Sequence, residues 1–224
     1  MPELTQEQRR AICFREAARA VIHALGGARV YRVAVAPAGS TSWRYQPRKG
    51  REIVDLLGVC EASDAPSVTM HVQWDDKAEQ FVGDREGFEQ LSEKARGIVV
   101  KGQPPMSQSE NLEVWRRLVR AHACSRLAGS VAASIYPLGA LAAEVDPAEF
   151  KHDLAVADGL SQLLPPGEFE NLKRTTDEML RTQSALARVT ALAEELERVG
   201  DMADQLANYL PEPLEGWPAA PATV

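Results

Sequence analysis

The stretch from Cys13 to Gly27, CFREAARAVIHALGG, constrains the fold most, because it sets charged residues into an apolar helical pattern. Thr5 and Gln8 upstream have the spacing of a capping box, and two glycines close the stretch as a stop signal. The apolar residues between these signals fall on one helical face, namely Phe14, Ala17, Ala18, Val21, Ile22 and Leu25. We therefore predict a helix in which Arg15, Glu16 and Arg19 lie close to the apolar face.

Composition excludes several classes of protein. The chain has 224 residues, 45% of them hydrophobic, which suits one domain, or one plus a small appendage, with a real core. Its formal charge of -7 disfavours non-specific binding of nucleic acid, which needs a basic surface. The first ten residues are too polar for a signal peptide, and no apolar run approaches the roughly 18 residues that span a bilayer. We expect a soluble, cytoplasmic protein that binds neither membrane nor nucleic acid.

The cysteines give no sign of a metal or redox motif. They are three in number, widely spaced, and no two have the C-x-x-C spacing: Cys13, Cys60 and Cys124. We expect reduced and mostly buried thiols, as in a reducing compartment.

The first half of the chain predicts a small sheet beside the first helix. Residues 28–37 alternate as a strand that ends at Pro37, and 38–50 form a polar loop. Residues 51–60 fit a helix or a strand equally well. Residues 67–76 predict a strand, with the turn at 62–66 able to join it to 51–60 as a hairpin. Residues 84–100 predict a short helix, and the prolines after it predict a loop.

The second half predicts helices at 109–135, 147–164, 169–199 and 201–210. Together the predictions give an α+β fold that is mainly helical, with a small sheet packed on the helical core. We expect one domain over 1–210, and a Pro-rich, disordered tail over 211–224.

Four blocks of the sequence, in order, resemble the FtsH-type zinc metallopeptidase domain. Arg15–Val21, REAARAV, is similar to that family's His-Glu-Ala-Gly-His-Ala-Val helix, and a strand ending in proline follows in both. LAGSVAA at 127–133 is similar to a Leu-Ala-Gly-Arg-Ala-Ala-Glu block. HDLAVADGLSQL at 152–163 is similar to a helix with an Asp-hydrophobic dipeptide, and LARVTALAEELERVG at 186–200 to the closing helix. The matched parts cover about 12–37 and 120–200, and the insert 40–115 has no counterpart.

The resemblance assigns roles to four positions of this chain. It implies that Glu16 stands where the family has the general base, and Asp153 where it has the third zinc ligand. Arg15 and Arg19 stand where the family has its two histidine ligands. An arginine stays protonated and has no lone pair to give a metal, so the replacements imply loss of zinc and of catalysis. Further departures are Ser130 and Ala133, where the family has Arg and Glu.

Charge suggests why the arginines are there. Arg15, Arg19, Glu16 and Asp153 sum to zero, as a zinc ion, two neutral histidines and two carboxylates do. We hypothesise an ion cluster in which the arginines replace the metal and tie the helix of Asp153 to the first helix. The alternative is that both arginines lie on a solvated flank, with only their aliphatic stems covering apolar surface.

Other candidate sites rest on fewer residues. Glu16 and His23 share a helical face, so they could form a displaced metal site with His122 or His152 as the third ligand. Ser130 has no histidine at a spacing that suggests a catalytic base. The tryptophans are expected to be core residues or anchors for a partner, namely Trp43, Trp74 and Trp115.

We therefore expect a catalytically inactive FtsH peptidase-like protein that acts as a binding or regulatory module and carries no cofactor. The insert 40–115 is expected to mediate self-association into a homo-oligomer or binding of an unknown protein or peptide partner. Two alternatives stay open: an active zinc-dependent metallopeptidase with a non-standard site, and a structural helical domain unrelated to peptidases.

Overall fold

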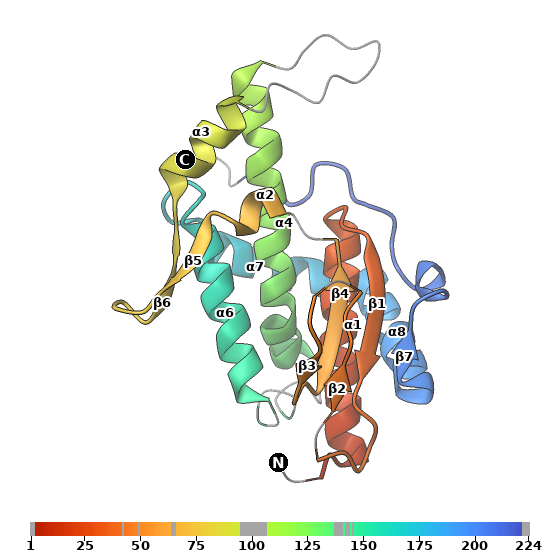
Figure 1. Ribbon diagram of the computed structural model, residues 1–224. Helices are drawn as coiled ribbons and strands as arrows, with labels where there is room; N and C mark the ends of the chain where they lie inside the picture. Colours follow the sequence, from red (N-terminus) through yellow and green to blue (C-terminus); the bar gives the residue numbers. More distant parts are fainter. Residues whose placement is uncertain are drawn as a thin grey trace.

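The computed structural model describes residues 3–220 except 42, 49, 64–65, 95–106, 137–140, 142–143 and 145 (Figure 1). Its helices are α1 (Gln6–Leu25), α2 (Pro66–Thr69), α3 (Arg85–Lys94), α4 (Gln108–Ile135), α6 (Pro147–Ser161), α7 (Glu168–Leu180), α8 (Gln183–Val199) and the 3-10 helix η1 (Leu206–Asn208). Its strands are β1 (Val30–Val35), β2 (Arg44–Tyr45), β3 (Ile53–Val54), β4 (Gly58–Ala62), β5 (Val72–Asp75), β6 (Gln80–Gly83) and β7 (Asp201–Met202). The predicted mainly helical α+β class is confirmed.

The first helix is the centre of the structure. The predicted capping box is present, because Thr5 accepts from the Gln8 backbone and Gln8 reaches back to the Thr5 backbone. The helix packs against α4, against α8, and against the sheet through β1 and β4. It ends at Gly26, where a Cβ would lie 2.8 Å from Cβ of Ala121 on α4. Because neighbours cover α1 on several sides, even its charged residues from position 15 onward are buried.

The main sheet is antiparallel, in the order β4-β1-β7, and lies along α1 (Figure 1). The ambiguous segment 51–60 contains β3 and the start of β4. The expected hairpin between 51–60 and 67–76 is wrong, because β4 pairs with β1, with Cys60 opposite Val33. Residues 38–50, expected to be loop, contain the short strand β2, which pairs with β3.

The predicted strand at 67–76 is wrong in its first half. Pro66 begins the short helix α2, in which Val68 is fully buried, and β5 begins only at Val72. Proline at a first helical position is pre-organised for helix, and burial of Val68 outweighs the alternation that suggested a strand. β5 pairs with β6, and this hairpin packs on α6, where a Cβ on Gly159 would lie 2.7 Å from Cβ of Phe81.

The predicted long helices are present, with one break that the apolar pattern does not show. The expected helix 169–199 is two helices, because α7 ends at Leu180 and the Thr182 side chain caps α8. The expected helix 147–164 ends earlier, at Ser161. The expected helix at 201–210 is wrong: Gly200, at φ 77°, ends α8, and β7 then pairs with β1 before η1.

Residues 211–220, expected to be a disordered tail, contact the rest of the structure at two places. Over 211–220 it has no helix or strand, yet the Leu214 backbone N–H donates to the Leu25 carbonyl. Trp217 packs against the core as well. Residues 221–224 lie outside the described part of the chain.

The apolar core is continuous through the described helices and the main sheet. As expected, Cys13, Cys60 and Cys124 are free thiols and are buried. Trp43 and Trp115 are half-buried against the core, whereas Trp74 is 51% exposed. None of the described helices is long and apolar enough to cross a membrane.

Candidate functional site

Arg15, Glu16 and Arg19 of α1 are buried where α1 meets α4, α6 and β4. Glu16 is 0% exposed, Arg15 2% and Arg19 6%, so the reading of a solvated flank is wrong. Two glycines let the neighbouring elements approach this face of α1. A Cβ on Gly58 of β4 would lie 2.8 Å from Cγ of Glu16, and one on Gly129 of α4 would lie 3.1 Å from Cγ of Arg15.

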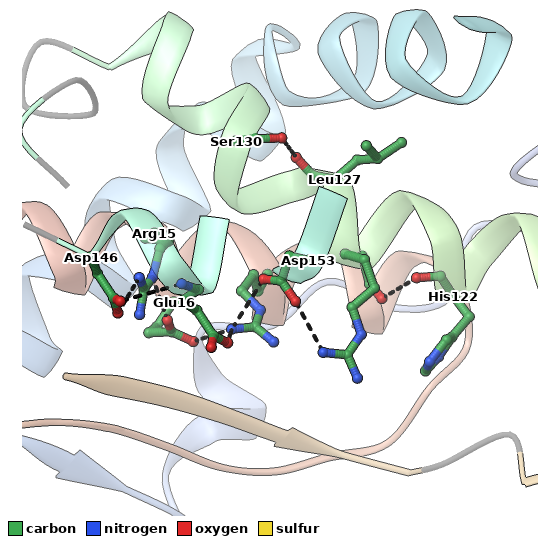
Figure 2. A network of polar contacts seen from close by, with 11 residues as sticks. Arg15, Glu16, His122, Leu127, Ser130, Asp146 and Asp153 are labelled. Carbon is green, nitrogen blue, oxygen red and sulfur yellow. Dashed lines mark hydrogen bonds and ion pairs between the residues drawn. The ribbon is translucent and has the colours of Figure 1, made fainter. Parts of the chain in front are cut away.

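Arg15 joins α1 to the start of α6. Its Nε donates to Glu16 Oε1 at 2.7 Å, and its Nη1 donates to Asp146 Oδ2 at 2.9 Å (Figure 2). The guanidinium carbon also lies 5.7 Å from the centroid of the Phe150 ring. The remaining nitrogen, Nη2, is buried without a hydrogen-bond partner.

Arg19 joins α1 to the middle of α6. Its Nη1 lies 3.3 Å from Glu16 Oε2, 3.4 Å from Glu149 Oε1 and 3.6 Å from Asp153 Oδ2. The hypothesis that Arg15, Arg19, Glu16 and Asp153 belong to one buried ion cluster is therefore confirmed. Asp153 does not cap its own helix, because Asp146 is the N-cap residue of α6.

The cluster is larger than the four residues that the sequence suggested. Arg126 of α4 donates from Nη1 to Asp153 Oδ1 at 3.0 Å, and Asp146 and Glu149 add two carboxylates. Asp146, Glu149 and Asp153 are spaced three and four residues apart, as on one face of a helix. This spacing could have indicated from the sequence that Asp146 and Glu149 lie beside Asp153. The full cluster has three guanidiniums and four carboxylates, so its formal charges do not cancel. The charges of the four residues suggested by the sequence do cancel.

Opposite charges keep the arginines ionised in this buried place. Burial alone would lower the pKa of Arg15 and Arg19, but the attraction of Glu16 and of the α6 carboxylates outweighs it and raises both pKa values. The pKa of the Glu149 carboxyl is also raised, by burial and then by the charge of Asp153.

The cluster does not fit the zinc ion that the resemblance implies. A guanidinium nitrogen of Arg19 lies between the Glu16 and Asp153 carboxylates, where a bound cation would have to lie. A guanidinium offers no lone pair and repels a cation. Among the residues that the structure describes, no group of three or more His, Cys, Asp and Glu side chains is arranged to hold a metal ion.

The displaced metal site is not assembled from the residues proposed for it. His23 lies against His122, with the ring centroids 6.1 Å apart. His152 lies elsewhere, against Phe81 of the hairpin. Burial lowers the pKa of both His23 and His122, the latter to about 4, with further lowering by nearby charged groups. Both rings are therefore neutral at pH 7.

Ser130 has no catalytic arrangement around it. Its hydroxyl donates to the Leu127 carbonyl at 2.9 Å within α4, which is visible in Figure 2. The Ser130 hydroxyl is therefore bonded within its own helix and not to a catalytic base.

A cavity of about 560 Å³ lies beside the ion cluster. The cluster residues Arg19, Arg126 and Glu149 line this cavity, and so does β4 from Gly58 to Ala62. β4 is the outer strand in the order β4-β1-β7, so one of its edges has no paired strand in that sheet. Guanidiniums, carboxylates and the backbone of β4 therefore line one cavity.

Comparisons of this chain with protein-family models, with curated proteins and with solved structures gave no match.

Proposed function

We propose that this chain is a catalytically inactive FtsH-type metallopeptidase-like domain that acts as a binding or regulatory module. The observation that carries the proposal is the ion cluster, in which Arg15 and Arg19 flank Glu16 and meet Asp153 across the α1–α6 interface. In the family that the sequence resembles, the corresponding positions would meet at a zinc ion. Here the guanidiniums supply the positive charge that joins the two helices.

The order and packing of the elements support the resemblance. α1 leads into β1, which lies antiparallel to β4 beside Glu16. The LAG block lies on α4 with Gly129 against Arg15, and Asp153 lies on the next long helix, α6. The helices that carry the first three similar blocks, α1, α4 and α6, therefore meet at one site.

Binding is the role that remains when the chemistry is lost. The cavity beside the cluster and the free edge of β4 can take an extended segment of a protein or peptide, whose backbone would pair with the strand. A buried ion cluster contributes a fixed geometry to such a site, because its members hold α1, α4 and α6 together.

Metal analysis of the purified protein, combined with a casein and peptide-library cleavage assay, tests the proposal. We expect no stoichiometric zinc and no cleavage, with Glu16→Gln indistinguishable from the unaltered chain in both assays. One zinc per chain with activity that Glu16→Gln abolishes would instead establish an active peptidase with a non-standard site. An array of extended peptides tests the binding role, and a complete lack of binding would favour a purely structural domain.

A further inference from the structure

The β5–β6 hairpin, residues 71–84, carries an excess of negative charge. It has four carboxylates against one lysine, namely Asp75, Asp76, Glu79, Asp84 and Lys77. All five residues are exposed, and no ion pair joins these carboxylates to a cation in the described part of the chain. The nearby Arg85 and Arg116 pair with Glu89 instead. The hairpin therefore offers uncompensated negative charge to a partner.

The β2–β3 hairpin, residues 44–55, has the opposite charge. It has four basic residues against two acidic ones, namely Arg44, Arg48, Lys49, Arg51, Glu52 and Asp55. Arg44 pairs with Glu52. Arg48 and Arg51 are exposed, and neither has a carboxylate partner among the residues that the structure describes. In a chain whose formal charge is -7, this hairpin is therefore a local excess of positive charge.

Both hairpins also expose apolar side chains. Ile53 and Val54 of β3 are exposed, as are Trp74 of β5 and Val82 of β6. These four are among the nine large hydrophobic residues that are exposed in the described part of the chain, so the two hairpins hold nearly half of them. Each hairpin is a separate two-stranded sheet, and such a sheet gains stability by packing against another surface.

The two hairpins lie on opposite sides of α6 (Figure 1). His152 of α6 is close to both. Its ring centroid lies 5.5 Å from that of Phe81 on β6, and it lines the cavity of about 560 Å³ that Arg48 and Ile53 also line. A two-fold axis near His152 therefore brings the basic hairpin of each copy against the acidic hairpin of the other, because an isologous contact is made twice.

We propose that two copies of this chain associate about a two-fold axis, with the β2–β3 hairpin of each copy against the β5–β6 hairpin of the other. A second copy fits better than an unrelated partner, because one chain carries both complementary surfaces and a dimer pairs all of them. Two acidic hairpins facing each other would repel. The inference goes beyond the proposed function, and its failure would leave that function standing.

Two charge-reversal variants test the proposal, with the molar mass of the full chain measured by light scattering. One carries Asp76→Lys with Glu79→Lys, and the other carries Arg48→Glu with Arg51→Glu. All four residues are exposed, so both variants should fold. We expect the unaltered chain to form a dimer at concentrations up to about 200 μM, and each variant alone to have a dissociation constant at least about tenfold higher. Raising NaCl from about 50 to about 500 mM should also weaken the unaltered dimer.

An equimolar mixture of the two variants tests the reciprocal pairing. Both hairpins are basic in the first variant and acidic in the second, so a mixed dimer pairs opposite charges at both contacts. We expect the mixture to dimerise with an affinity within about threefold of the unaltered chain. The control is Glu178→Lys with Glu194→Lys, which makes the same change in net charge on exposed positions of α7 and α8 and should leave the dimer intact.

Four results would each overturn the proposal. They are a monomeric unaltered chain at the highest concentration, variants that dimerise as tightly as the unaltered chain, a mixture that stays monomeric, and a control variant that dissociates as much as the acidic-hairpin variant. Circular dichroism of each variant confirms that it is folded before its molar mass is compared.

Discussion

Nη1 of Arg19 lies 3.6 Å from Oδ2 of Asp153, and both side chains are buried between α1 and α6. The two residues are far apart in the sequence, and their contact is one of the ion pairs that link α1 to α6. The same carboxylate receives a second guanidinium, from Arg126. Asp153 therefore holds α1, α4 and α6 together.

Asp153→Asn should strongly destabilise the protein. It would remove the charge that pairs with the buried Arg19 and the partly exposed Arg126, and breaking a buried ion pair costs about 3–5 kcal/mol. The free energy of unfolding from chemical denaturation measures the loss. The matched control is Asp177→Asn, which removes the partner of Arg181 on the exposed face of α7 and should leave the denaturation midpoint nearly unchanged. Equal midpoints for the Asp153→Asn variant and the unaltered chain would mean that the cluster does not stabilise the fold.

Arg15→His combined with Arg19→His should create measurable zinc affinity. The two positions are four apart on one helix, so both imidazoles can face one ion, and Asp153 lies against the same face of α1. Zinc calorimetry on the double variant checks this, with the same variant carrying Asp153→Asn as the control. A folded double variant that takes up no zinc would contradict the role assigned to Asp153.

Glu168→Gln should also destabilise the protein, at a second buried ion pair that the sequence did not suggest. Arg120 of α4 donates from Nε and Nη2 to the two oxygens of Glu168 on α7, at 2.7 and 2.8 Å. Both residues are at least nine-tenths buried, so we expect a loss of about 3–5 kcal/mol in the free energy of unfolding. Glu113→Gln is the control, because Glu113 also accepts from Arg120 but its side chain is 52% exposed, and its loss should cost about 0–1 kcal/mol.

Acid should destabilise the fold through His122, whose Nε2 is buried without a partner. The ring faces His23, and the charges of Arg19, Arg126 and Asp153 act on it as well. Its pKa falls from 6.5 in the unfolded chain to about 4 in the fold, so the unfolded state binds more protons as the pH falls through this window. The effect is absent at pH 7 and reaches about 3 kcal/mol near pH 4.

His122→Leu should therefore flatten the fall in unfolding free energy between about pH 6.5 and 4, measured by denaturation at each pH. His152→Gln is the control, because His152 is exposed, and its pH profile should match that of the unaltered chain. An unchanged profile in His122→Leu would show that other groups dominate the acid response.

The β5–β6 hairpin is the part of the insert that we expect to mediate self-association or partner binding. Trp74 and Val82 are exposed apolar side chains on it, at 51% and 37%. Trp74→Ser with Val82→Ser should shift light scattering toward the monomer, or weaken capture of a protein partner, because burying these side chains would stabilise the contact. Leu154→Ser removes an exposed apolar side chain of α6 and serves as the control. Unchanged assembly in the hairpin variant would place the contact elsewhere.

The sequence predicted those elements whose signals lie within a few residues. The capping box of Thr5 and Gln8, the glycines after Leu25 and the regular apolar spacing place α1 correctly, because backbone capping and helical periodicity act locally. The same reasoning failed at Thr182, where the apolar period continues through a break between α7 and α8. It also failed at β7, because pairing with β1 depends on a strand far away in the chain.

The sequence by itself determined that Arg15, Glu16 and Arg19 share one helix. That the two arginines stand at metal-ligand positions remains what the resemblance implies. Only the tertiary structure decided that these charges are buried, and that Asp146, Glu149, Asp153 and Arg126 complete the cluster. The physical reason is that burial and ion pairing across helices depend on which faces pack together. Glycines at 58 and 129 allow that close packing, but their effect appears only when β4 and α4 are placed against α1.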